Sequence, residues 1–391
     1  MSNAMLRISS SCQRTTRHVR HVPSLIAAPS VRFGDHALRT KSASFHAAGR
    51  AGVPLIQKQP LVRQRSRSTK SAQPCSRGTI RHACCYTTVS MAPQPIIHDI
   101  FESKTGTWQY VVADPVTKAA VIIDPVLDYD RTTQVISTSS ADGLLSLIKT
   151  NGYTVSRVLE THAHADHLTA ASYLQNRLTR AHELVQGHMP PIGIGKRISQ
   201  VQDLFIQRYG VPSEETQGVF DQLFNDDEEF AIGDLRATAL HLPGHTPDHL
   251  GYKIGDNVFC GDSLFHVDIG TARCDFPGGS ANNLFHSGRR LLSLPDHVKL
   301  WTGHDYPPKD RAQPVAWMTV RDHKKHNIHL RDSITEEEFV ARRKRRDASL
   351  GEPKLLHQSL QTNIRAGRLP QPTASGHRMF RLPVKLNGLQ W

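Results

Sequence analysis

The chain has 391 residues, enough for two average domains or for one large domain with appendages. Hydrophobic residues make up 38% of it, and no apolar run approaches the roughly eighteen residues of a membrane span, so we expect no membrane-spanning segment. The formal net charge of +13 arises in residues 1–98, which hold fifteen Lys or Arg and a single acid, Asp35. Because the remainder has 33 basic and 34 acidic residues, we expect no nucleic-acid partner.

Residues 1–94 form a leader that is rich in Arg and Ser and almost free of acids. This composition predicts a transit peptide that directs the protein to the mitochondrial matrix, and a disordered basic tail is the alternative. Met91 offers an internal start that would give a cytosolic form. Outside the leader only Cys260 and Cys274 remain, too few for a disulfide framework, so a reducing compartment fits.

The following residues, 95–310, read as an α/β domain. Residues 108–114 and 120–124 are β-rich runs that predict a hairpin. Residues 141–149 have helical spacing and end at Asn151-Gly152, a good C-terminal stop. A strand over 155–160 and a helix over 168–178 are expected next, and further strands are expected at 235–240, 257–260 and 298–301.

Residues 311–391 read as a C-terminal extension that is mainly helical. A helix is expected to begin at Thr335, because acids at its start and basic residues at its end complement the helix dipole. A last strand is expected over 378–386. No function follows for this extension, and a homodimer contact is left open.

Four metal-ligand residues lie within six positions, directly after the strand predicted at 155–160: His162, His164, Asp166 and His167. The two-residue period of a strand points the imidazoles of His162 and His164 the same way. Asp166 and His167 are expected at the first turn of the next helix. Imidazole and carboxylate are ligands that zinc, iron and manganese share, and a His-rich polar loop is the alternative reading.

Three later loops repeat this arrangement at the end of an apolar run. Each carries one ligand-type residue directly after a glycine: His245, Asp262 and His304. Glycine lets the backbone turn sharply where a metal crowds it. Because ligands from several strand ends converge at one edge of a sheet or sandwich, we expect one metal site there.

These motifs resemble the signature of the metallo-β-lactamase superfamily over residues 97–310, which implies a four-layer αββα sandwich with the metal at one edge. Within it, the pattern is most similar to the persulfide dioxygenases of the ethylmalonic encephalopathy type and their β-lactamase-hydrolase-like branch. The motifs that carry this similarity are Asp124-Pro125-Val126, Pro243-Gly244-His245-Thr246-Pro247, Arg273-Cys274-Asp275-Phe276, His304-Asp305-Tyr306 and Asn363-Ile364-Arg365-Ala366-Gly367.

The resemblance implies one Fe(II) per chain, bound by His162, His245 and Asp262. The remaining ligand-type residues would surround this iron without binding it: His164, Asp166, His167 and His304. Arg273 and Tyr306 would line the substrate pocket, Arg273 facing a carboxylate of the substrate and Tyr306 its sulfur. An ion pair between Arg273 and Asp275 is the alternative. The implied reaction oxidises glutathione persulfide with O2 to sulfite and glutathione, a step of sulfide detoxification.

A dinuclear zinc thioesterase of the glyoxalase II type is the alternative function, since all seven ligands for two metals are present. Its glutathione-binding region would correspond to residues 324–329, which is not a close match. A nuclease of the same fold is disfavoured, because the domain lacks the excess of cations that phosphate binding needs.

Overall fold

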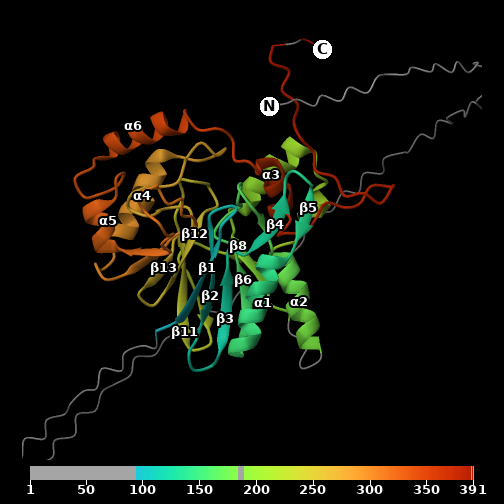
Figure 1. Ribbon diagram of the computed structural model, residues 1–391, viewed down its shortest axis with the longest axis horizontal. Coiled ribbons are helices and arrows are strands. Elements are labelled where there is room, and N and C mark those ends of the chain that lie inside the picture. Colours follow the sequence, from blue (N-terminus) through green and yellow to red (C-terminus); the bar gives the residue numbers. More distant parts are fainter. Residues whose placement is uncertain (1–93, 184–188, 389, 391) are drawn as a thin grey trace, which may run out of the picture. The chain divides into compact units, whose positions relative to one another are not determined.

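The computed structural model describes residues 94–183, 189–388 and 390. The predicted leader therefore lies outside the described residues, apart from Gln94. Two six-stranded sheets form the centre of the domain, and helices cover their outer faces (Figure 1).

The first sheet has the strand order β1-β2-β3-β6-β8-β9. Its antiparallel edge is a meander of three strands, and the parallel strands β6, β8 and β9 follow on the other side of β3. The strands are β1 (Ile96–Glu102), β2 (Thr107–Ala113), β3 (Ala119–Ile123), β6 (Thr154–Leu159), β8 (Ile192–Gly195) and β9 (Gln222–Phe224).

The second sheet has the order β10-β11-β12-β13-β14-β15, and only the β13–β14 pair is parallel. The last strand comes from the C-terminal extension and pairs with β14. The strands are β10 (Glu228–Ile232), β11 (Leu235–His241), β12 (Leu250–Ile254), β13 (Asn257–Phe259), β14 (Lys299–Trp301) and β15 (Trp317–Thr319). A small third sheet contains β5 (Val135–Ser137), β4 (Val126–Asp130) and β7 (Leu168–Thr169).

Alternation along the strands builds three apolar layers. On β2, Val111 packs toward the outer helices, whereas Tyr110 and Val112 pack between the sheets, as the two-residue period requires. The outer layer of the first sheet contains α1 (Ser139–Asn151), α2 (Ala171–Glu183) and α3 (Ile198–Tyr209). The outer layer of the second sheet contains α4 (Ala281–Leu292), α5 (Val320–His326) and α6 (Glu336–Asp347). The predicted αββα sandwich is confirmed.

Most of the individual elements lie where the sequence predicts them. The hairpin of β2 and β3 is antiparallel, and α1 ends at Gly152, whose left-handed backbone (φ 65°) donates its N–H to carbonyls of the last turn. Thr335 begins α6 with a reciprocal capping box to Glu338. Between Ser213 and Glu215 the chain forms one 3-10 turn.

Two predicted elements are wrong. Leu168 and Thr169 form strand β7, which pairs with Val126 and Leu127, so the helix begins only at Ala171. Asp166 and His167 therefore lie in a loop before a short strand, not on a helical turn. Residues 378–386 form no strand: the backbone of Arg381 bonds to the side chain of Gln361 on α7 (Leu356–Asn363), and Arg378 makes only an isolated bridge to Pro372.

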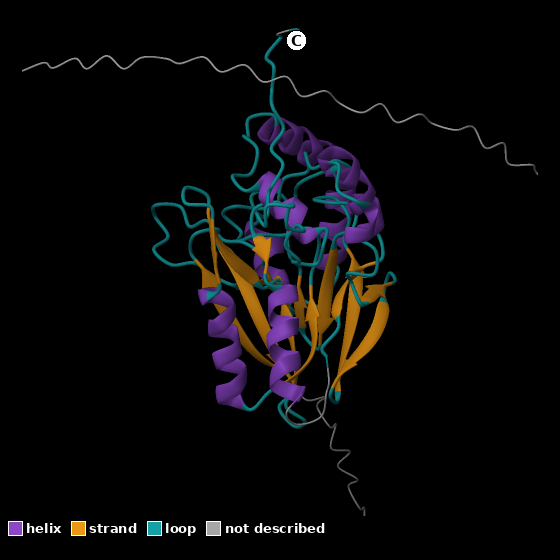
Figure 2. Cartoon of the chain, turned by 90° about the vertical axis from the view of Figure 1, so that its right-hand side faces the viewer, coloured by secondary structure: helices purple, strands orange, loops and turns teal. Residues whose placement is uncertain are grey.

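Loops gather at one end of the strands, where the two sheets meet (Figure 2). Here β6 of the first sheet and β11, β13 and β14 of the second sheet lead into the loops that carry His162, His245, Asp262 and His304. The backbone of Trp108 donates to the carbonyl of Gly303 and so ties the two sheets together at this edge. In the part of the chain that the structure describes, no helix has the length and apolar character to cross a membrane.

Candidate metal centre

His162, His245 and Asp262 offer ligand atoms that all lie within 4.8 Å of one another. All three side chains are buried, and His245 Nε2 lies 3.5 Å from Asp262 Oδ2. Strand ends predicted seven ligand-type residues, the family resemblance singled out this trio among them, and the fold brings the three side chains together.

Hydrogen bonds on the far side of each imidazole determine which nitrogen faces the centre. His245 donates from Nδ1 to the carbonyl of Arg273 at 2.7 Å. His162 donates from Nδ1 to Thr161 Oγ1 at 3.0 Å, and that hydroxyl donates in turn to Asp124 Oδ2 at 2.8 Å. Both Nε2 atoms are thereby left as lone-pair donors, the arrangement that metal-bound histidines adopt.

Two glycines allow the ligand loops to approach so closely. Gly261 has φ 46°, and a Cβ there would lie 2.7 Å from Thr161 Oγ1. At Gly303 a Cβ would lie 2.5 Å from Asp262 Oδ1. At Gly261 the left-handed backbone requires a glycine, and at Gly303 the lack of room for a Cβ requires one.

His164 points its Nε2 away from the trio. This nitrogen lies 3.1 Å from Asp124 Oδ1 and 3.2 Å from Glu160 Oε2, with all three side chains buried. Burial opposes protonation, but the two carboxylates outweigh it and raise the pKa of His164 well above its ordinary value. For His162, burial and the neighbouring histidines lower the pKa well below its ordinary value, so its imidazole is neutral and free to donate a lone pair.

Asp166, His167 and His304 form a second set on the other side of Asp262. Asp166 Oδ2 lies 3.2 Å from both His167 Nδ1 and His304 Nε2. Burial would raise the pKa of Asp166, but the two histidines hold it well below its usual range. Among the described residues, Asp166 and His167 belong to a compact ligand group with His164, whereas His304 belongs to none.

The trio fits a metal ion on the chemistry of its donors. His162 Nε2 and Asp262 Oδ1 are buried and have no hydrogen-bond partner in the described chain. Buried polar atoms are rarely left unpaired, so these two call for a ligand. Two imidazoles and one carboxylate suit iron, zinc or manganese, and the donor set alone does not choose between them.

Arg273 and Tyr306, the two residues predicted to touch substrate, contact different members of the centre, Arg273 through His245 and Tyr306 through His304. Arg273 binds Asp275 through Nε and Nη2 at 2.6 and 2.5 Å and donates from Nη1 to the carbonyl of Gly351. The alternative reading of Arg273 as an ion-pair residue is therefore confirmed. Tyr306 is 51% exposed and stacks on His304 with ring centroids 5.7 Å apart.

A cavity of about 150 Å³ opens beside His245. Its wall includes Arg273, but also Arg208 on α3 and Glu352 just before α7, which the sequence did not single out. No local motif marks these two residues, because they come from elements that meet only in the folded chain.

Asn363 of α7 is the other residue whose role the sequence did not reveal. Its Nδ2 donates to the carbonyls of His164 and His167 at 2.8 Å each, and its Oδ1 accepts the N–H of Thr169 at 2.9 Å. From the sequence alone, the motif that begins at Asn363 indicates only a family resemblance. The C-terminal extension therefore holds the loop that carries His162.

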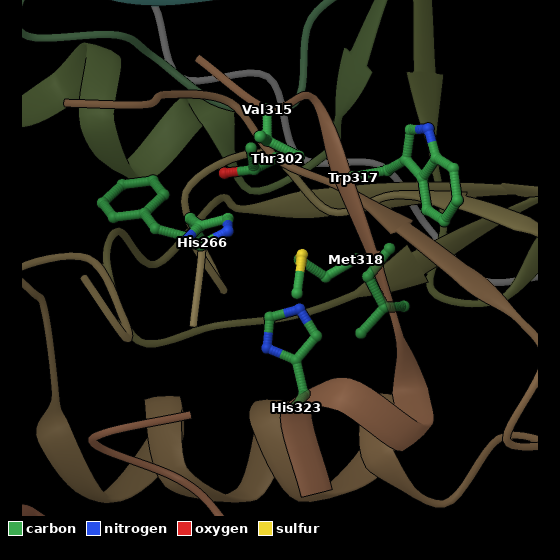
Figure 3. A pocket seen from close by; sticks show the side chains of 8 residues that line it. His266, Thr302, Val315, Trp317, Met318 and His323 are labelled. Carbon is green, nitrogen blue, oxygen red and sulfur yellow. The ribbon is translucent and has the colours of Figure 1, made fainter. Parts of the chain in front are cut away.

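A second hollow lies between α5 and the second sheet, where His266, Met318 and His323 approach one another (Figure 3). It has no space for a water-sized molecule. Burial lowers the pKa of His323 to about 4, and its Nδ1 accepts a hydrogen bond from Asn327. This hollow is a packing feature, not a binding site.

The fold and the metal centre together define the class. The model of the metallo-beta-lactamase superfamily matches residues 104–304. The beta-lactamase hydrolase-like protein of Xylella fastidiosa is 42% identical over 299 residues, which cover 76% of this chain and 67% of that protein. The chain therefore belongs to the metallo-beta-lactamase superfamily.

Other relatives carry names of different enzymes. Glyoxylase B2 of Dictyostelium discoideum is 40% identical over 286 residues, covering 72% of this chain and 94% of that protein. The mitochondrial persulfide dioxygenase ETHE1 of Homo sapiens is 26% identical over 283 residues, which cover 71% of this chain and 91% of that protein. The crystal structure of ETHE1 from Myxococcus xanthus, 28% identical, matches with a TM-score of 0.55 and covers 70% of this chain and 100% of that one.

Proposed function

We propose that the protein is a mononuclear iron dioxygenase that acts on glutathione persulfide. One glutathione persulfide, one O2 and one water would give glutathione, sulfite and two protons. The observation that carries the proposal is the compact trio of His162, His245 and Asp262, whose ligand atoms all lie within 4.8 Å of one another.

Two imidazoles and one carboxylate are the ligand set of non-haem iron oxygenases, because they leave positions open for substrate and oxygen. When bound, ferrous iron would supply the change of oxidation state that O2 chemistry requires and that zinc lacks. His164 Nε2 is hydrogen-bonded to Asp124 Oδ1 and lies 3.2 Å from Glu160 Oε2, so this nitrogen is not available to a metal ion. The similarity to ETHE1 proteins supports the same chemistry.

The surrounding residues would position the substrate and control its protons. Desolvation beside the centre and the carboxylates of Asp166 and Asp262 raise the pKa of Tyr306 well above its ordinary value. Its hydroxyl therefore stays protonated at neutral pH and can donate a hydrogen bond to the persulfide. Arg273 would act on His245 rather than on substrate, because its carbonyl accepts the Nδ1–H and its guanidinium fixes the loop through Asp275.

A dinuclear thioesterase is the second candidate. Asp166, His167 and His304 lie beside Asp262 and are the residue types that a second metal needs, with His304 Nε2 at 3.5 Å from Asp262 Oδ1. The similarity to Glyoxylase B2 favours it as well.

Oxygen uptake distinguishes the two candidates. We expect the anaerobically purified full-length protein to consume one O2 per sulfite formed from glutathione persulfide and to hydrolyse S-lactoylglutathione negligibly. His162→Ala should abolish oxygen uptake, whereas His297→Gln, at an exposed histidine, should leave it unchanged. Rapid lactoylglutathione hydrolysis without oxygen uptake would assign the protein to the second candidate.

A further inference from the structure

The cavity beside His245 extends from a buried apolar part to a charged rim. Ala165 and Phe276, both buried, lie on its wall next to the metal ligand. Arg208 and Glu352, both exposed, bring opposite charges to the same wall. A ligand that fits this cavity places an apolar or soft group near His245 and a polar, charged group at the rim.

Arg273 also lies on this wall, but each of its three guanidinium nitrogens already donates a hydrogen bond. Its fork is bonded to Asp275 and its remaining Nη1 to the carbonyl of Gly351. A substrate carboxylate would have to displace Asp275, which forms a two-point hydrogen bond of the strong, charge-assisted kind.

Arg208 is differently placed. Among the described residues no carboxylate oxygen lies within 4.0 Å of its guanidinium, which instead lies 5.8 Å from the ring centroid of Phe205. Phe205 in turn packs on Phe276 of the cavity wall, with ring centroids 5.5 Å apart. The guanidinium lies over the aromatic ring, and its fork remains available to a carboxylate.

Glu352 supplies the complementary charge. It pairs with Lys385 at 3.2 Å, but both side chains are more than half exposed, so this pair adds little and can open. A ligand ammonium at the rim can compete for the same carboxylate. An α-amino acid, with its carboxylate and ammonium on one carbon, offers both charges side by side.

We infer that Arg208 and Glu352 bind the zwitterionic γ-glutamyl end of a glutathione-type thiol, Arg208 taking the α-carboxylate and Glu352 the α-ammonium. This inference rests on the proposed function for the sulfur end of the ligand only. It assigns specificity for a small zwitterionic thiol carrier over inorganic persulfide, which has no such end.

Binding of reduced glutathione to the full-length protein, measured by calorimetry, tests the assignment without any turnover. Arg208→Gln and Glu352→Gln should each raise the Kd roughly tenfold, the loss expected for one charge-assisted contact. Arg236→Gln, which removes an exposed arginine paired with Glu229, is the matched control and should leave the Kd unchanged. Thermal melts of the variants verify folding.

Two glutathione analogues assign each charge to its residue. N-acetylglutathione lacks the ammonium, so the wild-type protein should bind it more weakly than it binds glutathione. The Glu352→Gln variant should bind the two compounds equally well. γ-Aminobutyryl-cysteinylglycine lacks the α-carboxylate, so the wild-type protein should bind it more weakly than glutathione, whereas the Arg208→Gln variant should bind both equally well. Equal Kd values for wild type and both variants, or no glutathione binding by wild type, would overturn the assignment. Failure of oxygen uptake with glutathione binding intact would instead count against the proposed reaction alone.

Discussion

Gly303 lies between Thr302 and His304 and faces the carboxylate of Asp262. A methyl group there would lie 2.5 Å from Asp262 Oδ1 and 3.0 Å from the backbone of Gly261. Gly303→Ala should therefore displace the carboxylate and lower metal content at least tenfold, with a stability loss of about 1–3 kcal/mol. Metal analysis after dialysis measures the first effect and urea unfolding the second.

Gly143→Ala on α1 is the matched control, because no atom lies within 4 Å of a Cβ at that position. It should keep full metal content and unfold at an equal or slightly higher urea concentration. Retention of wild-type metal content by Gly303→Ala would show that the loop can shift without moving the ligand.

At the residue scale the sequence predicts that the ligand-type residues gather, because each one follows an apolar strand and strand ends meet at one edge of a sandwich. The structure brings His162, His245 and Asp262 together, the three residues that the family resemblance singles out. The sequence could not predict the bonding of His164, since Asp124 reaches it from forty positions away. Nor could it show that Arg273 would be held by Gly351, seventy-eight positions further along the chain.

At the scale of elements, α7 is the part of the extension that acts on the metal loop. Asn363→Asp replaces two N–H donors with a carboxylate, leaving the buried carbonyls of His164 and His167 unpaired. We expect a stability loss of about 2–4 kcal/mol and weaker metal binding. Urea unfolding and metal titration measure these effects, and Asn283→Asp at an exposed position of α4 is the control.

Asn363 also explains why the predicted helix at 168–178 starts late. Its side chain accepts the N–H of Thr169, and Leu168 and Thr169 pair with β4. These contacts come from residues far away in the sequence, and they override the local helical preference of the segment.

Wild-type metal affinity in Asn363→Asp would mean that α7 only packs against the loop.

The α5 helix contains a titratable group that couples stability to pH. Burial lowers the pKa of His323 to about 4, and Asn327 donates to its Nδ1, so the folded state holds the neutral form. The unfolded chain, with an ordinary pKa near 6.5, binds the proton first as pH falls. This group therefore leaves stability unchanged above pH 6.5 and reduces it between pH 6.5 and 4.

Unfolding in urea at pH 7.5 and pH 5 measures this coupling. We expect His323 to cost about 2 kcal/mol of stability at pH 5 relative to pH 7.5. His323→Gln should lose this part of the pH dependence, whereas exposed His297→Gln should keep it. Equal pH dependence in wild type and His323→Gln would contradict the assignment.

At the scale of the whole molecule, we propose that the leader directs the protein to the mitochondrial matrix. Its basic, acid-poor composition supports this, with a cytosolic form starting at Met91. Mass spectrometry of the protein recovered from mitochondria should find an N-terminus within or just after the leader. An intact Met1 there would count against cleavage.

The whole-molecule fold could be predicted as an αββα sandwich, because the ligand motifs resemble those of the metallo-β-lactamase superfamily over residues 97–310. How the C-terminal extension contacts the site could not be predicted from the sequence. Its strand β15 joins the second sheet and its helix α7 contacts the metal loop, and both contacts form only in the folded chain. Arg208 and Glu352 meet at the cavity only through this arrangement.

The metal content per chain of the full-length protein, purified without oxygen from cells supplied with both iron and zinc, tests the mononuclear centre most directly. We predict one iron per chain, lost in Asp262→Ala and retained in His167→Gln. Two metal ions per chain, falling to one in His167→Gln, would contradict a single-metal dioxygenase.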